Sequence, residues 1–179
     1  ILDKYHDKKI NSFNKIVAVE RNIRNVMVDG IPLKGKIDKM EFDGHKVNVV
    51  DYKTGNPDNA KAKLKNPESD PPYGGDYWRQ AVFYKLLIDN NDQGKYQVMS
   101  TEFDFVEPNA KKEISSILVP ISKDDTDAVR EQIQMVWEKI QARDFYTGCG
   151  KQDCHWCNFV KTNKLQVGFV EEEQEVLFD

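Results

Sequence analysis

The sequence has few cysteines, no long hydrophobic run and no excess of basic residues. Its 179 residues include three cysteines, all after position 148, and an odd number in one short segment argues against the disulfide framework of a secreted protein. No apolar stretch approaches the roughly 20 residues that cross a bilayer, and no signal peptide precedes the first predicted strand. We therefore expect a soluble, cytoplasmic protein that does not associate with a membrane.

The charge balance gives no overall sign of nucleic-acid binding, because 26 Lys and Arg stand against 30 Asp and Glu. Five of the acids lie in the last nine residues, "EEEQEVLFD". We interpret residues from about 165 to 179 as a solvated acidic tail. The sequence also lacks a G-x-x-x-x-G-K-[ST] loop, so any ATP-driven motor must lie outside this segment.

Length and composition indicate one globular domain over residues 1–179, with its core at about 16–160. The chain is 39% hydrophobic and 31% charged, which is typical of a folded domain of this length. It begins at Ile1 instead of Met, and we take this as a sign that it is a piece of a longer polypeptide.

Hydrophobic periodicity predicts an α/β fold with a mixed central β-sheet flanked by helices. Residues 55–75 carry four prolines and three glycines and are expected to form a long loop. A second long helix is expected to begin at Ser122 with Asp125 as its capping partner. Strands are predicted at about 16–28, 31–42, 45–55, 96–108 and 113–121, and helices at 2–14, at 77–90 after a cap at Asp76, and from 122 onward.

Two of the predicted strands form a hairpin, and their alternation brings charged residues to one face. If Asp43-Gly44 is a two-residue turn, Asp38 lies opposite Val49. Because side chains alternate between the two faces of a strand, Asp38, Asp51 and Lys53 then emerge on the same face. This inference depends on the hairpin register.

Two neighbouring carboxylates repel each other, and a hard divalent cation removes that repulsion. Mg²⁺, or Mn²⁺ in its place, commonly binds through one or two carboxylates together with substrate phosphate. With Lys53 next to such an ion, the arrangement suits hydrolysis of phosphodiester bonds. The alternative is an ordinary charged strand end, in which Asp51 pairs with Lys36 across the hairpin.

Four motifs occur in an order that resembles the PD-(D/E)XK nuclease superfamily. They are "GKIDK", "VVDYKTG", "RQAVFY" and a C-terminal segment with cysteines. Within the superfamily the sequence is most similar to the RecB/AddB-type nuclease domains attached to UvrD-like helicases. The resemblance covers about residues 17–160 and implies a restriction-endonuclease-like core with Mg²⁺ as cofactor.

By this resemblance, six residues have functional roles. Taken alone, a tyrosine such as Tyr84 is more often a core residue, and a glutamine such as Gln80 a surface residue. The resemblance implies that Asp38 and Asp51 are metal ligands, that the backbone carbonyl of Tyr52 is a further ligand, that Lys53 is the catalytic lysine, and that Gln80 and Tyr84 contact substrate phosphate or the lysine.

The sequence departs from the resemblance at its two ends. Relatives carry a metal-binding His in a G-x-x-x-H context on a helix before the first strand, whereas His6 lacks that context. Some relatives hold a [4Fe–4S] cluster with four cysteines, whereas Cys149, Cys154 and Cys157 are one thiolate short of the four that a cluster or structural Zn²⁺ needs. For this chain we prefer three reduced thiols, a judgement that a fourth upstream Cys would reverse.

The function that we expect is Mg²⁺-dependent hydrolysis of DNA, as part of an ATP-dependent helicase-nuclease in DNA repair or recombination. DNA and a helicase motor domain or subunit are the expected partners. Lys61, Lys63 and Lys65 of the long loop are weaker candidates for contact with the DNA backbone. Two alternatives stay open: a DNA-binding or scaffolding module without catalysis, and a free-standing restriction or CRISPR-associated nuclease.

Overall fold

A computed structural model describes residues 2–13, 16–67, 73–144 and 152–162. The chain divides into two units, residues 1–138 and residues 139–179, which are described separately. The first unit contains a five-stranded mixed sheet with helices against it, so the predicted fold class is confirmed. The strands, in their order across the sheet, are β1 (Val17–Val28), β2 (Ile31–Asp43), β3 (Lys46–Lys53), β4 (Gln97–Phe105) and β5 (Ser116–Val119).

The three predicted helices are present, and the described residues contain further short helices at 57–63, 91–94 and 155–162. The loop expected at 55–75 contains two short helices, because the Asn56 side chain accepts from the backbone N–H of Asp58 at 2.8 Å and Pro57 fixes the first turn. The helices are α1 (Leu2–Lys9), η1 (Ile10–Ser12), η2 (Pro57–Asn59), α2 (Ala60–Lys63), α3 (Asp76–Asp89), η3 (Asn91–Gly94), α4 (Lys123–Gln141) and, in the second unit, α5 (His155–Thr162).

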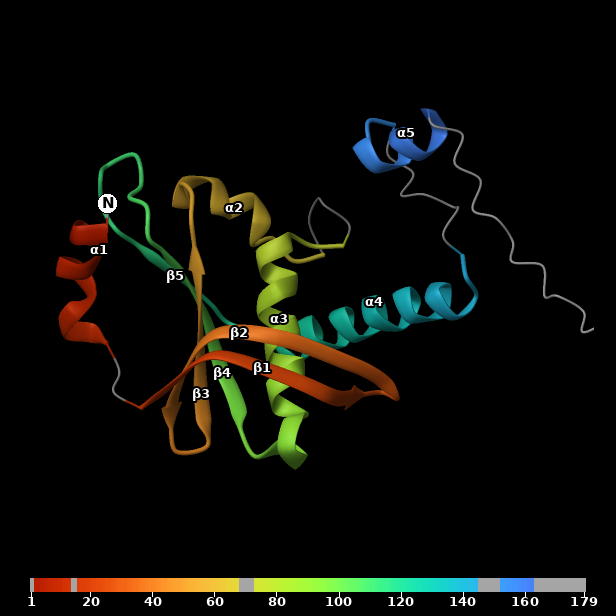
Figure 1. Cartoon of the computed structure of the whole chain (residues 1–179), viewed down its shortest axis with the longest axis horizontal. Coiled ribbons are helices and arrows are strands. Elements are labelled where there is room, and N and C mark those ends of the chain that lie inside the picture. The colour runs from red at the N-terminus through yellow and green to blue at the C-terminus, as the bar shows by residue number, and fades with distance from the viewer. Residues whose placement is uncertain (1, 14–15, 68–72, 145–151, 163–179) are drawn as a thin grey trace, which may run out of the picture. The chain divides into compact units, whose positions relative to one another are not determined.

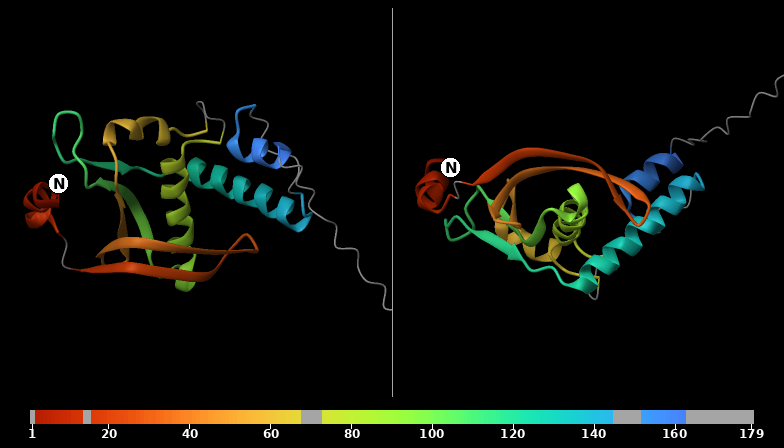
Figure 2. Two further views of the ribbon diagram at one scale, coloured as in Figure 1. Left: turned by 45° about the horizontal axis from the view of Figure 1, so that its top comes forward. Right: turned by 90° about the horizontal axis from the view of Figure 1, so that it is seen from below.

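The sheet combines both kinds of strand pairing (Figure 1). Strands β1, β2 and β3 form an antiparallel meander, β3 and β4 run parallel, and β5 returns antiparallel to β4. A parallel pair needs a long crossover connection, and α3 lies within the one that joins β3 to β4. The sheet curls around α3, so that this helix lies on its concave face (Figure 2).

The hairpin of β2 and β3 turns one residue later than predicted. Asp43 pairs with Lys46, so the two-residue turn is Gly44-His45 and not Asp43-Gly44. Gly44 has φ +60°, a left-handed conformation that glycine adopts at little cost. Every cross-strand partner therefore shifts by two residues, which changes the partners but leaves each side chain on its predicted face.

The new register changes the expected neighbours of Asp38. The pairing runs to Lys39 opposite Val50, and its next position sets Asp38 across from Asp51 instead of Val49. Lys36 is not the partner of Asp51 either. Lys36 lies opposite Asn22 of β1, and its ammonium forms an ion pair with Glu20, which is also in β1.

The helix starts agree with the sequence in one case and differ in the other. For α4, the backbone N–H of Asp125 donates to Ser122 Oγ at 3.1 Å and the Ser122 N–H donates to Asp125 Oδ2 at 2.8 Å, which confirms the predicted cap. For α3, the capping residue is Gly75, and Asp76 is the first helical residue. A negative charge in this first turn still interacts favourably with the helix dipole.

Helix α3 forms most of the core contacts between helix and sheet. Its buried side chains include Ala81 and Leu87, both 0% exposed, which pack against the concave face of the sheet. On the opposite face, α1 is anchored by Tyr5, whose ring lies edge-on to the Tyr52 ring at 6.5 Å. None of the helices in the described residues is both long and apolar enough to cross a membrane.

We predict that Leu87→Ala lowers the free energy of unfolding by about 2–5 kcal/mol, because the substitution leaves a cavity between α3 and the sheet. Leu2→Ala is the matched control, since Leu2 also lies on a helix but is 71% exposed, and should change stability by less than about 0.5 kcal/mol. Urea denaturation measures both values. Equal effects of the two substitutions would show that α3 is not the central core helix.

Candidate active site

Asp51 is a carboxylate at the buried end of a central strand. Only 3% of the residue is exposed. Its Oδ2 lies 2.7 Å from the Nζ of Lys53, and its Oδ1 accepts from the Tyr84 hydroxyl at 2.6 Å and from Gln80 Nε2 at 3.0 Å. Because a buried carboxylate is costly unless it is paired and hydrogen-bonded, these three partners explain how the charge is tolerated.

Lys53 comes two residues later on the same face and is held equally closely. Its ammonium donates to Gln80 Oε1 at 2.8 Å in addition to its ion pair with Asp51. The same nitrogen lies 4.8 Å from the centroid of the Tyr77 ring and 5.2 Å from that of Phe103. The side chain is 16% exposed, so its position is fixed by contacts on several sides.

The other two partners come from successive turns of α3. Gln80 bridges the site, because its amide group contacts Lys53 with the oxygen and Asp51 with the nitrogen. Gln80 Nε2 also donates to the Tyr84 hydroxyl at 2.6 Å. Burial, and then the hydrogen bond to Asp51, raise the pKa of Tyr84 far above its usual range. Tyr84 is therefore a neutral hydrogen-bond donor at physiological pH.

Asp38 reaches the same end of the hairpin from β2. It is half-buried, and its Oδ2 accepts from the backbone N–H of Tyr52 at 3.1 Å. Its negative charge also raises the pKa of Tyr84, which indicates that Asp38 acts on the same cluster. The side chain of Tyr52 lies on the opposite face, against Tyr5 of α1.

The donor set suits a hard cation that takes the rest of its ligands from elsewhere. Among the described residues, no three His, Cys, Asp or Glu side chains converge on one point. Asp38 and Asp51 are the two carboxylates of the candidate site, and a Mg²⁺ ion held by them would take the rest of its ligands from a backbone carbonyl, water and substrate oxygen. Mg²⁺ commonly binds through such a combination of oxygen ligands. The carboxylate oxygens of Asp38 and Asp51 are therefore chemically suited to this ion.

Other residues singled out in the sequence lie elsewhere. His6 is on α1, and its side chain is 62% exposed. Its Nδ1 lies 3.6 Å from Oδ1 of Asp7, which is not one of the site carboxylates. Cys154 and Cys157 are half-buried at the start of α5 in the second unit, and Cys149 lies outside the described residues. The acidic tail from about 165 to 179 likewise lies outside the described residues, and the predicted cluster at the cysteines stays untested.

Tyr77, the first residue of the helix predicted at 77–90, also lies at the candidate site. Its ring packs against Phe103 and Phe105 of β4 and lies next to the ammonium of Lys53. Helical spacing holds the signal that could have identified it, since Tyr77 precedes Gln80 by three residues and Tyr84 by seven.

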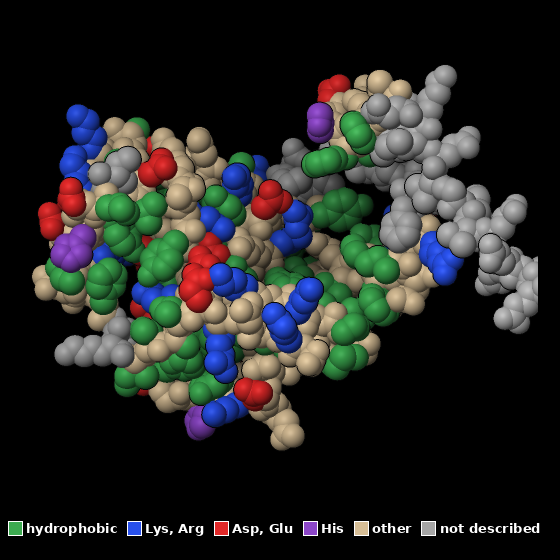
Figure 3. Space-filling model, viewed as in Figure 1, with side chains coloured by type: hydrophobic (Ala, Val, Ile, Leu, Met, Phe, Trp, Pro, Cys, Tyr) green, Lys and Arg blue, Asp and Glu red, His purple; other side chains and the backbone are tan. Residues whose placement is uncertain are grey.

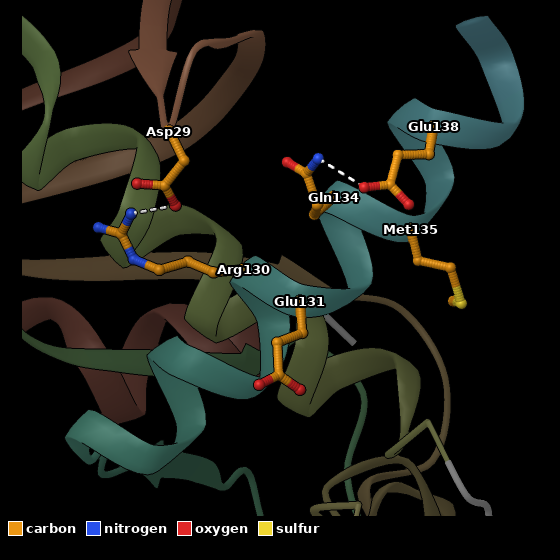
Figure 4. Close-up of a pocket in the computed structure, with 6 residues that line it drawn as sticks. All are labelled: Asp29, Arg130, Glu131, Gln134, Met135 and Glu138. Atoms are coloured by element: carbon orange, nitrogen blue, oxygen red, sulfur yellow. Dashed lines mark hydrogen bonds and ion pairs between the residues drawn. The ribbon is translucent and has the colours of Figure 1, made fainter. Parts of the chain in front are cut away.

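A separate hollow of about 350 Å³ lies between the turn of β1 and β2 and helix α4 (Figure 4). Arg130 of α4 forms an ion pair with Asp29 of the turn at 2.6 Å, and Glu131 and Glu138 also line the hollow. Three carboxylates against one guanidinium give it a negative charge, which disfavours a polyanion there.

The comparisons with known proteins agree with this architecture. The model of the PD-(D/E)XK nuclease superfamily matches residues 2–162. The chain therefore belongs to the PD-(D/E)XK nuclease superfamily. A comparison with curated proteins found no match.

Two solved structures are similar to the chain at 14% sequence identity, each with a TM-score below 0.5. The crystal structure of SSO0001 has a TM-score of 0.47 over 89% of this chain and 63% of that one. A proposed exonuclease from Eubacterium rectale has a TM-score of 0.46 over 88% of this chain and 55% of that one. The chain thus spans less than two thirds of either protein.

We predict that Tyr84 does not ionise between about pH 9 and 11, where exposed tyrosines titrate. Its raised pKa means that the folded state favours the neutral phenol, so the stabilisation is fully present below about pH 10, where the unfolded chain titrates, and is lost progressively as pH rises from there through the folded pKa. Tyr84→Phe should leave the absorbance change of tyrosinate formation unaltered in this window. A smaller absorbance change in Tyr84→Phe than in the wild type would contradict the raised pKa.

Proposed function

We propose that this chain is a metal-dependent nuclease domain that hydrolyses phosphodiester bonds of DNA. The proposal rests on one observation: Asp38 from β2 and Asp51 and Lys53 from β3 meet at one end of the hairpin. Helix α3 holds the last two through Gln80. A site without function has no need to keep a paired carboxylate and ammonium buried against two further donors.

In the proposed reaction, a water oxygen bonds to phosphorus, the bond from phosphorus to the leaving oxygen breaks, and the leaving oxygen gains a proton. Lys53 sits where its ammonium can orient the water or stabilise the negative charge that develops on the phosphoryl oxygens. Gln80 fixes the direction of that ammonium from α3. The neutral Tyr84 orients Asp51 by donating a hydrogen bond to its Oδ1.

A divalent cation held by Asp38 and Asp51, with the Tyr52 carbonyl as a further proposed ligand, would supply Lewis-acid activation of the phosphodiester. Mg²⁺ and Mn²⁺ are the proposed ions. The family resemblance implies that Gln80 and Tyr84 contact substrate phosphate or the lysine. In the structure Gln80 contacts the lysine, and contact with substrate stays part of the proposal.

We further propose that the domain works within a larger helicase-nuclease in DNA repair or recombination. The support is the order of its motifs, "GKIDK", "VVDYKTG" and "RQAVFY", which resembles RecB/AddB-type domains. On this proposal the motor domain lies on another part of the polypeptide or on a partner subunit. Co-purification of an ATP-hydrolysing partner tests this part separately from the chemistry.

We predict that Asp51→Asn and Lys53→Gln each lower the rate of DNA cleavage in Mg²⁺ by on the order of 100-fold or more, since each removes a charge at the reacting centre. The measurement is cleavage of end-labelled single- and double-stranded DNA, with Mn²⁺ as a second cation. Thermal melting of each variant shows whether the fold survives, because loss of one partner exposes a buried charge to an apolar environment.

The matched controls are Asp43→Asn and Lys46→Gln. These two residues pair at the other end of the same hairpin and are exposed, so they reproduce both charge changes away from the site. Their cleavage rates should equal that of the wild type. A folded Asp51→Asn variant that cuts DNA at the wild-type rate would refute the proposed site.

A further inference from the structure

The side chain of Lys63 lies beside the proposed active site although it belongs to a different helix. Its Nζ is 4.9 Å from the centroid of the Tyr77 ring, and the Nζ of Lys53 is 4.8 Å from the same centroid. The two ammonium groups therefore lie less than about 10 Å apart. One aromatic ring thus attracts two cations through its negatively charged face.

The two lysines differ in how much charge they can offer to a ligand. The ammonium of Lys53 is compensated by Asp51 and is mostly buried. Lys63 is exposed, and among the described residues it has no carboxylate partner. The positive charge beside Lys53 that no carboxylate of the described residues compensates therefore comes from Lys63. Figure 3 shows Lys and Arg side chains over α2 and the adjoining end of α3.

The close approach of the α2 backbone to Gly75 determines the position of the Lys63 backbone. The N–H of Gly75 donates to the carbonyl of Lys65 at 2.7 Å. A Cβ at Gly75 would lie 2.2 Å from the carbonyl oxygen of Lys63, closer than any side chain can come. Only a glycine at the start of α3 therefore lets the end of α2 lie against it, and this contact places Lys63 over Tyr77.

We propose that Lys63 and the Tyr77 ring form a binding subsite for a second phosphate of the nucleic-acid strand that is cut. A strand advances about 3.4 Å along the helix axis per phosphate, so two ammonium groups within 10 Å reach phosphates one to three positions apart. Lys53 then faces the phosphate that reacts, and Lys63 holds the strand on one side of it. This inference rests on the proposed function and adds a contact that determines affinity.

The test is the salt dependence of DNA binding, measured by fluorescence anisotropy in EDTA so that no cleavage occurs. Loss of one phosphate contact reduces the slope of log K against log salt by about 0.7 for single-stranded and 0.9 for double-stranded DNA. Lys63→Gln should show this reduction and bind roughly five- to eightfold more weakly at about 0.1 M salt, which follows from the same slope.

Lys95→Gln is the matched control. The ammonium of Lys95 also lies over a tyrosine ring, 5.2 Å from the centroid of Tyr96. Lys95 precedes β4 and lies at the other end of the sheet. Its substitution should leave the slope unchanged. Gly75→Ala is the second variant, because it keeps the charge of Lys63 while displacing its backbone. In a protein that still melts cooperatively, it should weaken binding, and adding Lys63→Gln should change little more.

Each outcome separates the subsite from the proposed chemistry. An unchanged slope for Lys63→Gln overturns the subsite, and equal reductions for Lys63→Gln and Lys95→Gln reduce it to bulk charge, which also overturns it. If the wild type binds DNA with the expected Lys63 dependence but cuts none in Mg²⁺ or Mn²⁺, the subsite stands and the proposed hydrolysis fails. If the wild type binds no DNA in EDTA, the subsite is overturned, and the cleavage assay in Mg²⁺ or Mn²⁺ decides the proposed hydrolysis by itself.

Discussion

The burial of the Asp51 carboxylate is the constraint on which the arrangement of this domain depends. A carboxylate that is 3% exposed needs compensation from every side, because water cannot supply it. The strand itself supplies Lys53, and α3 supplies Gln80 and Tyr84. Helix α3 must therefore lie across the end of β3, and the curl of the sheet around it gives the helix its buried surface (Figure 2).

The two faces of β3 carry separate polar networks that meet in its backbone. On the face opposite Asp51, the hydroxyl of Tyr5 donates to Asp104, and Lys9 forms an ion pair with the same carboxylate at 2.9 Å. Tyr52 connects the faces, because its ring touches α1 while its N–H donates to Asp38. The anchoring of α1 and the placing of Asp38 thus share one residue.

Much of the fold could be predicted because it depends on local patterns. Alternation and turn residues identify all five strands, and the Ser122 cap identifies the start of α4. The predicted hairpin turn was wrong by one residue. Both Asp43-Gly44 and Gly44-His45 place a glycine in the two-residue turn, so the turn residues alone do not distinguish them. The error moved the register by two residues, and the period of two in a strand preserved the predicted faces.

For the proposed site, the sequence by itself determined which residue types share a face of the hairpin, because side-chain alternation follows from the backbone. Only the tertiary structure decided that Tyr77 and Lys63 join them. Their positions depend on how α3 packs on the sheet and how closely α2 approaches Gly75. Helical spacing could place Tyr77 on the same face of α3 as Gln80. The approach of α2 to α3, in contrast, arises from packing between separate segments and leaves no periodic signal in the sequence.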